Sequence, residues 1–446
     1  MGGEPEPWGP LRQGGRRWRG LRRTLKALGV VGLVSVVAMV STGFELYRQF
    51  EQSVTRVPLD QLEQTAPVDA RHFLVVGSDS RGDLDDDTRS GLSLGDFEGQ
   101  RSDTIIYAAI SRDRSSVSLV SMPRDLLVID DGRQRKLTDV FAGGADDLIR
   151  VITSNFGLPV NHYAKVSLGG FVEAVRTIGG VDICLDEPLR DWRAGADFDA
   201  GCHRMDAEEA LAYVRSRQGS RADFERIDRQ QTFIQATLQE LTERQILTNV
   251  PRLFQLVEDV SSHVVTDQNL GLTQMRGLAD EMRTVVRDGM PMTTVPGYTR
   301  RIDGIDYVIA YRPGAEALFE DLRAGRALED PGTRDERAET TVAVWSGGRS
   351  RATGIVGDTL LYAAFDAVPS GVGPSDTNAG STTTIYRVGG DDAAAGWVAA
   401  TLGAPIRDLP AGVDAPEGAD VVVAVGDDAH GGSPEESRSA GDGQGH

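Results

Sequence analysis

Histidine and cysteine are scarce in this sequence, with six and two residues respectively among 446. His72, His162 and His203 are scattered and do not have the spacing of zinc ligands. Cys184 and Cys202, with only His203 nearby, supply too few ligands for a metal site. The chain also lacks a Walker loop, a Rossmann glycine fingerprint and a nucleophile elbow. The sequence therefore gives no support to zinc chemistry, to those two nucleotide-binding motifs or to serine hydrolysis of that type.

Beyond the N-terminus, acidic residues outnumber basic ones. The chain has 47 Lys and Arg against 67 Asp and Glu, a formal net charge of -20. Residues 1–26 carry seven basic and two acidic side chains, a balance of +5 that leaves -25 for the remainder. So acidic a body argues against non-specific nucleic-acid binding. The length indicates two or three domains, and 40% hydrophobic residues are ample for packed cores.

One long uncharged run follows the basic arm, from Ala27 to Phe44. Its length of about 18 residues is close to that needed to cross the apolar core of a bilayer. A signal peptide cleaved near 40–42 is the alternative, but its apolar stretch would be shorter. We therefore predict a basic arm over 1–26 and an uncleaved transmembrane helix over 27–46. Because basic residues stay on the cytoplasmic side, we expect a single-pass protein of the cell membrane, cytoplasmic at its N-terminus and extracytoplasmic beyond it.

The two cysteines fall in the part of the chain that this topology places outside the cytoplasm. An even cysteine count in an oxidising compartment predicts a disulfide, here between Cys184 and Cys202. Two unpaired buried thiols are the alternative. The disulfide would staple a segment rich in Asp, Gly and Arg.

A polar stalk is expected over 47–69, followed by a domain over 70–325 in which strand-like and helical segments alternate. Strand patterns occur at 73–77, 104–110, 116–121, 162–167, 181–185 and 292–296. Helical patterns occur at 144–156, 168–178, 206–215, 223–247, 250–262 and 271–287. The first strands are nearly all apolar, as is typical of strands covered on both faces. The fold class predicted is α/β, with a mixed central β-sheet covered by helices on both faces.

The C-terminal part has a different composition. A charged linker over 326–339 leads to a small α/β module over 340–426, whose Gly-Gly and Ser/Thr-rich connections are typical of turns. Residues 427–446 are rich in Gly, Ser, Asp and Glu, and we expect them to be disordered.

Charged residues gather at the predicted strand ends. The turn at 112–115 suits a hairpin between the second and third strands, and a hairpin symmetric about 113–114 places Asp103 opposite Arg124. The first strand ends at 77–81 and would reach the same edge of the sheet. This geometry predicts a cluster of Asp79, Arg81, Arg101, Asp103, Arg124 and Asp125.

A dense arginine cluster stands out on so acidic a chain, within residues 213–231. It comprises Arg215, Arg217, Arg221, Arg226 and Arg229. The planar guanidinium fork suits bidentate binding of phosphate oxygens, which indicates a polyanion site. The alternative is a surface helix stabilised by ion pairs three and four residues apart, such as Asp223–Arg226 and Glu225–Arg229.

A helical projection from Asp223 gives the cluster a geometry. The apolar stripe expected to face the core holds Phe224, Ile227, Ile234, Leu238 and Leu241. Asp223, Arg226 and Gln230 border this stripe, and Arg229 lies further round. Glu225 and Asp228 are expected to face solvent.

Carboxylates such as Asp79 and Asp103 beside several arginines suggest phosphate chemistry assisted by Mg²⁺, which binds through few carboxylates plus substrate phosphates.

Seven short motifs in one consistent order resemble the LytR-CpsA-Psr (LCP) family over about 70–325. Those of the body are Val75-Val-Gly-Ser-Asp-Ser-Arg81, Arg101-Ser-Asp-Thr104, Ser121-Met-Pro-Arg-Asp125, His162-Tyr163, Gly179-Gly-Val181, Ala210-Leu-Ala-Tyr-Val-Arg-Ser-Arg217 and Asp223-x-x-Arg226-x-x-Arg229-Gln230, and the basic arm and anchor precede them. The 340–426 module resembles the LytR C-terminal domain of actinobacterial members. The chain departs from the family pattern at Lys136-Leu-Thr138 and Met205-Asp-Ala207, which bears on loop shape and removes no charged ligand.

The resemblance implies an enzyme. Family members are phosphotransferases that move a glycopolymer from a polyprenyl-pyrophosphate carrier to peptidoglycan outside the membrane, usually onto the 6-hydroxyl of muramic acid. Pyrophosphatase activity is an implied side reaction. The apolar faces of the central helices would line a groove for the polyprenyl tail.

The resemblance also implies site residues. Asp79 and Asp103 match the aspartates near Mg²⁺, and Asp125 and Asp223 are the candidates for a general base. Catalytic roles are predicted for Arg124, Arg226, Asp223 and Asp125. Contacts to the substrate pyrophosphate are predicted for Arg81, Arg101, Arg124, Arg215, Arg217, Arg226, Arg229 and Gln230.

Two other functions remain open from the sequence. One is a membrane-anchored envelope regulator, a transcriptional attenuator, against which the acidic body and outward topology argue. The other is a non-catalytic scaffold that binds wall or lipid mainly through the 340–426 module.

Overall fold

The computed structural model describes residues 54–62, 71–78, 102–218, 222–246, 249–271, 290–346, 348, 350–374, 377 and 380–429. The predicted basic arm, transmembrane helix and most of the stalk lie outside these residues. So do Asp79, Arg81, Arg101, Arg221 and the side chains of Asp103 and Asp223. Within the described ranges, no helix has both the length and the apolar character to span a bilayer.

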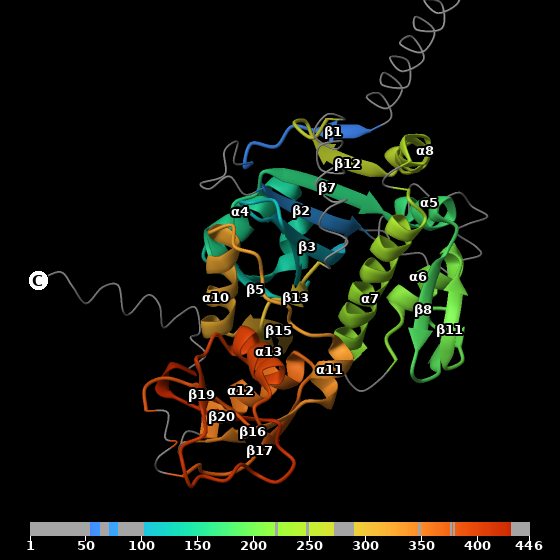
Figure 1. The fold of residues 1–446 in the computed structure, drawn as a ribbon. Coiled ribbons are helices and arrows are strands. Elements are labelled where there is room, and N and C mark those ends of the chain that lie inside the picture. The colour runs from blue at the N-terminus through green and yellow to red at the C-terminus, as the bar shows by residue number, and fades with distance from the viewer. Residues whose placement is uncertain are drawn as a thin grey trace, which may run out of the picture. The chain divides into compact units, whose positions relative to one another are not determined.

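The described part of the chain contains a central sheet of seven strands in the order β1-β12-β7-β2-β3-β4-β13 (Figure 1). Its strands are β1 (Thr55–Val57), β2 (Arg71–Ser78), β3 (Ser102–Ile110), β4 (Val117–Met122), β7 (His162–Ser167), β12 (Val264–Asp267) and β13 (Met292–Thr294). Some neighbouring strands are antiparallel, such as β2 with β3, and others are parallel, such as β2 with β7. The predicted mixed sheet is confirmed.

The register of the β3–β4 hairpin agrees with the prediction. Ile110 pairs with Val117 and Ile105 with Met122, so the hairpin is symmetric about 113–114. The ladder ends at Ile105 and Met122 and Arg124 lies in the turn after β4, so the predicted placement of Asp103 opposite Arg124 lies beyond the paired residues. The end of β2 joins the same edge, because Gly77 pairs with Thr104.

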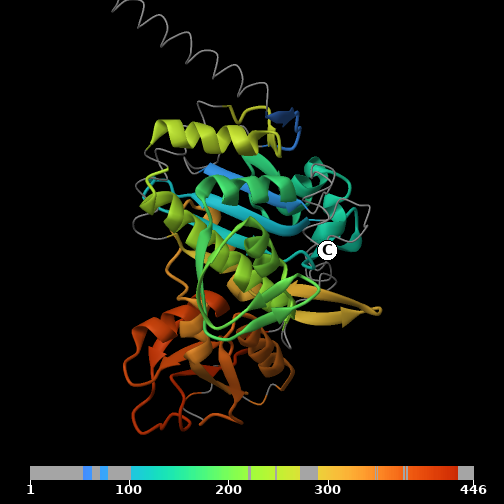
Figure 2. The same cartoon turned by 90° about the vertical axis from the view of Figure 1, so that its right-hand side faces the viewer.

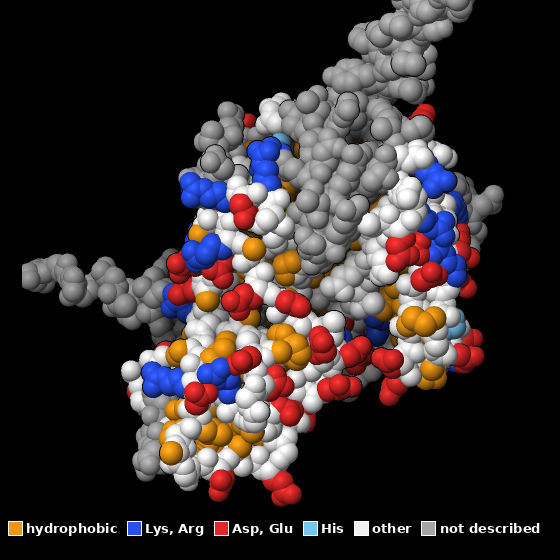
Figure 3. All heavy atoms as spheres, viewed as in Figure 1, with side chains coloured by type: hydrophobic (Ala, Val, Ile, Leu, Met, Phe, Trp, Pro, Cys, Tyr) orange, Lys and Arg blue, Asp and Glu red, His pale blue; other side chains and the backbone are white. Residues whose placement is uncertain are grey.

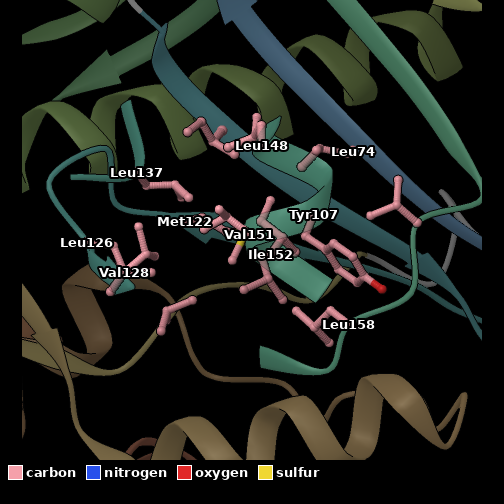
Figure 4. Packing of buried hydrophobic residues seen from close by; sticks show 14 of the residues in the cluster. Leu74, Tyr107, Met122, Leu126, Val128, Leu137, Leu148, Val151, Ile152 and Leu158 are labelled. Carbon is pink, nitrogen blue, oxygen red and sulfur yellow. The ribbon is translucent and has the colours of Figure 1, made fainter. Parts of the chain in front are cut away.

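One face of the sheet carries the main hydrophobic core. It is covered by α3 (Leu137–Phe141), α4 (Ala145–Phe156) and α10 (Arg312–Arg323). In Figure 4, Leu74, Tyr107 and Met122 from the strands meet Leu148 and Ile152 of α4. Full burial of a large aliphatic side chain contributes about 1.5–3 kcal/mol, so this cluster fixes α4 firmly on the sheet. The helix ends at Gly157, which has φ +64°, as the sequence predicted.

The opposite face carries α5 (Leu168–Ile178), α6 (Ala207–Arg215), α7 (Ala222–Glu243) and α8 (Val250–Ser261). These helices pack with two small hairpins, β8 (Val181–Leu185) with β11 (Gly201–Met205) and β9 (Leu189–Asp191) with β10 (Ala196–Phe198). Cys184 and Cys202 lie directly opposite each other in β8 and β11 and form the predicted disulfide. The loop closed by this bond contains β9 and β10.

Two further hairpins were not predicted. The hairpin of β5 (Leu127–Asp130) and β6 (Arg133–Lys136) follows β4. The hairpin of β14 (Gly297–Ile302) and β15 (Ile305–Ala310) projects from the body in Figure 2. The predicted strand at 292–296 ends as β13 at Thr294, and a new strand begins at Gly297.

A five-stranded sheet of order β17-β16-β20-β18-β19 forms the C-terminal part of the described chain. Its strands are β16 (Thr341–Trp345), β17 (Asp366–Pro369), β18 (Thr384–Arg387), β19 (Ile406–Asp408) and β20 (Val421–Ala424). The helices here are α11 (Arg334–Glu339), α12 (Ser350–Tyr362) and α13 (Asp392–Leu402). Part of the expected disordered tail is ordered, because Asp427–Ala429 form a 3-10 helix in which Asp428 accepts a hydrogen bond from the Thr383 N–H. Acidic side chains gather on the surface around α11 in Figure 3.

Candidate active site

A cavity of about 720 Å³ opens on the side of the central sheet opposite the main core. The strands β2, β3 and β7, the helices α5, α6 and α7, and the β9–β10 turn all contribute to its wall. Its apolar lining includes Val75, Ile106, Val166, Leu168, Phe171, Leu211, Val214, Phe233 and Ile234. Such a wall suits an apolar ligand or ligand segment.

Four of the predicted pyrophosphate-binding residues line this cavity: Arg215, Arg217, Arg226 and Gln230. Arg226 is the most enclosed, with only 3% of its surface exposed. Arg217 is exposed, and Arg215 and Gln230 are half-buried. A buried guanidinium keeps its charge and has little water to screen it, so the cavity is an attractive place for an anion.

Gln230 links the helix α7 to the sheet. The Thr104 hydroxyl donates a hydrogen bond to Gln230 Oε1 at 3.0 Å, and both residues line the cavity. At the adjoining end of β3 the ladder is irregular: Gly77 pairs with Thr104 but Ser78 pairs with Ser102. Asp103 is therefore the extra residue of a β-bulge. Bulges often stand beside active sites, where they redirect a side chain.

Asp191 is a site residue that the sequence did not reveal. Its carboxylate accepts hydrogen bonds from the Arg217 N–H at 2.7 Å, the Arg193 N–H at 3.0 Å and the Ser216 hydroxyl at 3.3 Å. Burial raises the pKa of Asp191, but these hydrogen bonds together outweigh it and lower the pKa below its usual value. Asp191 thus fastens the β9–β10 turn to the segment that carries Arg215 and Arg217.

Strand β9 and the turn after it also bring Arg190, Trp192 and Arg193 to the wall of the cavity. The Arg190 guanidinium is occupied by Asp197, at 2.9 Å, and by Asp199. Arg193 lies over the Trp192 ring, 5.4 Å from its centre. No short motif marks this turn, so only the folded arrangement of the disulfide-closed loop reveals it.

Arg229 and Asp228 do not line the cavity. Arg229 pairs with Glu225 at 3.4 Å and donates to the Gln218 carbonyl at 3.2 Å. Burial lowers the pKa of Arg229 and raises that of Asp228. The prediction that Asp228 faces solvent is wrong, because its side chain is 19% exposed and pairs with Arg334 of α11 at 2.6 Å. The helical projection could not anticipate α11, which arrives from a segment more than 100 residues away.

The predicted apolar stripe of α7 was also incomplete. Phe233 lies outside the stripe and is 6% exposed within the second hydrophobic core. Ile234, inside the stripe, lines the cavity and is only half-buried. The helix therefore buries two sides, one against the neighbouring helices and one along the cavity.

Arg124 and Asp125 follow β4 and are not among the residues that line the cavity. Arg124 Nε lies 3.7 Å from the Asp125 carboxylate, which also pairs with Lys136 at 3.0 Å. Lys136 belongs to the segment that departs from the family pattern. Asp125 therefore has two cationic neighbours, Arg124 and Lys136.

Among the described residues, no three His, Cys, Asp or Glu side chains are grouped as a metal site would require. The predicted Mg²⁺ ligand Asp79 lies outside the described residues, as does the side chain of Asp103. The predicted general base Asp223 is likewise described only in its backbone.

An apolar cavity with a buried arginine and further arginines in its wall has the shape and charge that suit an amphipathic anion. A model of the LytR_cpsA_psr family matches residues 34–324, well over half of the sequence. The chain belongs to this family.

Two curated relatives illustrate the assignment. The chain is 31% identical over 324 residues to "Probable cell wall biosynthesis protein LcpB" of Corynebacterium glutamicum, covering 72% of this chain and 77% of that protein. It is 27% identical over 305 residues to "Polyisoprenyl-teichoic acid--peptidoglycan teichoic acid transferase TagU" of Halalkalibacterium halodurans, covering 65% and 93%. Among solved structures, the "LytR-Csp2A-Psr enzyme from Actinomyces oris" matches with 22% identity and a TM-score of 0.49, over 61% of this chain and 96% of that one.

Proposed function

We propose that this protein is a phosphotransferase that attaches a glycopolymer from a polyprenyl-pyrophosphate carrier to peptidoglycan, outside the cytoplasmic membrane. The observation that carries the proposal is the cavity that combines an apolar wall with Arg215, Arg217, Arg226 and Gln230. A lipid-linked pyrophosphate has the same combination of an apolar chain and a compact polyanion. The family membership and the teichoic acid transferase among the relatives support the same chemistry.

In the proposed reaction, an acceptor hydroxyl oxygen of peptidoglycan attacks the phosphorus that bears the glycan. The bond from that phosphorus to the bridging oxygen breaks, and polyprenyl phosphate leaves with the electron pair. The hydroxyl proton passes to a base, for which Asp125 and Asp223 are the candidates. Arginines at the leaving phosphate stabilise the charge that develops on it. With water as the acceptor, the same step is a pyrophosphatase side reaction.

Mg²⁺ is part of the proposal. Asp103 occupies a β-bulge beside Thr104, so its backbone lies next to the arginine-lined cavity. Mg²⁺ needs only one or two carboxylates when substrate phosphates complete its coordination, and Asp79 with Asp103 would supply them. The ion would neutralise charge on the pyrophosphate. The protein is further proposed to be anchored in the membrane by residues 27–46.

The proposal is tested with the full-length protein in detergent, geranylgeranyl pyrophosphate and Mg²⁺. Wild-type protein should release phosphate, and Arg226→Ala should lower the turnover about 100-fold. Chelation of Mg²⁺ should abolish release, and added Mg²⁺ should restore it. The matched control is Arg301→Ala, since Arg301 is 69% exposed on the β14–β15 hairpin. Phosphate release that is equal in wild type and Arg226→Ala would contradict the proposal.

A further inference from the structure

Trp192 is unusually exposed for so large an apolar side chain. Its exposed fraction is 84%, the highest among the large hydrophobic residues in the described ranges, and it is the one aromatic in that group. Tryptophan has a large apolar surface whose exposure to water is unfavourable, and it is enriched where proteins bind other molecules. It also lies on the rim of the cavity.

The turn that carries Trp192 is held in place from three directions. The Asp191 carboxylate accepts hydrogen bonds from the N–H groups of Arg193 and Ala194, which tighten the turn, and from Arg217, which ties it to the arginine-bearing segment. The Cys184–Cys202 disulfide closes the loop around it. Arg193 covers one side of the indole ring, a favourable cation–π arrangement. The indole is thus presented on an anchored turn beside the arginines.

The residues that line the cavity differ in exposure. Leu211, Phe233 and Arg226 are buried, Arg217 is exposed, and Trp192 is the most exposed of the lining residues that bear large apolar side chains. A lipid-linked glycan has three parts in a fixed order: a hydrocarbon tail, a pyrophosphate and a sugar. With the tail along the apolar wall and the pyrophosphate at the arginines, the next group outward is the first sugar.

We propose, on the basis of the proposed function, that Trp192 and Arg193 form a subsite for the sugar attached to the pyrophosphate. A pyranose ring has an apolar face of C–H groups, which would bury area against the indole, and hydroxyl groups at its edge. Arg193 makes no ion pair with a described residue, so its N–H donors are available to those hydroxyls. The subsite selects donors that carry a pyranose and contributes little to the binding of the lipid pyrophosphate itself.

The test compares two probes with the full-length protein in detergent. One is geranylgeranyl pyrophosphate, and the other is the same lipid pyrophosphate bearing one N-acetylglucosamine. Trp192→Ala should weaken binding of the sugar-bearing probe roughly tenfold and change the affinity for the sugar-free probe by less than twofold. Trp192→Phe should keep most of the affinity for the sugar-bearing probe. Ile305→Ala, at an exposed apolar residue of the β14–β15 hairpin, is the control and should change neither affinity.

Equal weakening for both probes, or none for either, would overturn the subsite while the proposed function stands. A wild-type protein that binds neither probe would overturn both proposals. Vesicles of anionic phospholipid without either probe provide a third arm. If Trp192→Ala reduces sedimentation with these vesicles and leaves the sugar-bearing probe unaffected, Trp192 contacts a lipid surface and the sugar subsite is wrong.

Discussion

His72 is a fully buried histidine in the centre of the sheet, on β2. Neither ring nitrogen has a hydrogen-bond partner among the described residues, and the ring lies 5.6 Å from that of Tyr107. Burial without a counter-charge disfavours the charged imidazolium, which lowers the pKa of His72 to about 4. The folded protein therefore holds a neutral histidine that the unfolded chain protonates near its ordinary pKa.

This difference makes stability depend on pH. Between the unfolded pKa of 6.5 and the folded pKa of about 4, the unfolded chain binds the extra proton, so the free energy of unfolding falls as the pH falls. At 1.36 kcal/mol per pKa unit, the loss is about 3 kcal/mol between pH 7 and pH 4. Denaturant titrations of wild type and His72→Leu should show this component in wild type alone, and His203→Leu should keep the wild-type dependence. Parallel pH profiles for wild type and His72→Leu would refute the prediction.

Asp191 is a second single residue that gives a testable prediction, in this case for the candidate active site. We expect Asp191→Ala to raise KM for the lipid pyrophosphate about tenfold and to change kcat much less, because the carboxylate positions Arg217 without touching the reacting atoms. Its pKa is depressed in the folded state, so its stabilising effect is complete above the ordinary value of 3.8 and is lost only as pH falls below that. The KM effect should therefore be constant across neutral pH. A fall in kcat with unchanged KM would show that Asp191 has a different role.

The helix α7 joins three parts of the molecule. Gln230 bonds to β3, Phe233 packs in the second core, and Asp228 pairs with Arg334 of α11. Thr333, the N-cap residue of α11, directly precedes Arg334 and forms a capping box with Glu336. The ion pair thus connects the helix of the site to the segment that leads into the C-terminal sheet.

Removal of Arg334 would leave the enclosed Asp228 carboxylate without its nearest cation. Arg334→Ala should lower the free energy of unfolding by about 1–3 kcal/mol, and adding Asp228→Asn should recover part of that loss. The control is Arg312→Ala, which breaks an exposed pair with Glu316 and should cost no more than about 0.5 kcal/mol. Denaturation curves measure all three. If Arg334→Ala costs no more than the control, the pair does not stabilise the fold.

Much of the fold follows from local sequence signals. The helix and strand boundaries at 162–185 agree with prediction because Ser167 caps α5 and Gly179, at φ +86°, ends it. The β3–β4 register was predictable because a short symmetric turn fixes it. In contrast, the Asp191 clamp, the Asp228–Arg334 pair and the position of Phe233 arise from contacts between segments distant in sequence. No periodicity or spacing in a single segment encodes such contacts.

At the scale of the whole molecule, charge bears on the alternatives. The body beyond residue 26 carries -25, and Arg215, Arg217 and Arg226 line one cavity rather than an open stripe. A surface that binds DNA would present its cations outward. The arrangement favours a small, amphipathic anion over a nucleic acid.

The transfer itself tests the central claim most directly. Full-length protein in detergent is incubated with Mg²⁺, isolated peptidoglycan and a lipid pyrophosphate whose N-acetylglucosamine is radiolabelled. With wild-type protein, the label should become covalently attached to the peptidoglycan and lipid phosphate should be released. The rate of attachment should be about 100-fold lower with Arg226→Ala and unchanged with Arg301→Ala. Attachment at the same rate in wild type and Arg226→Ala, or none above a protein-free control in wild type, would contradict the account.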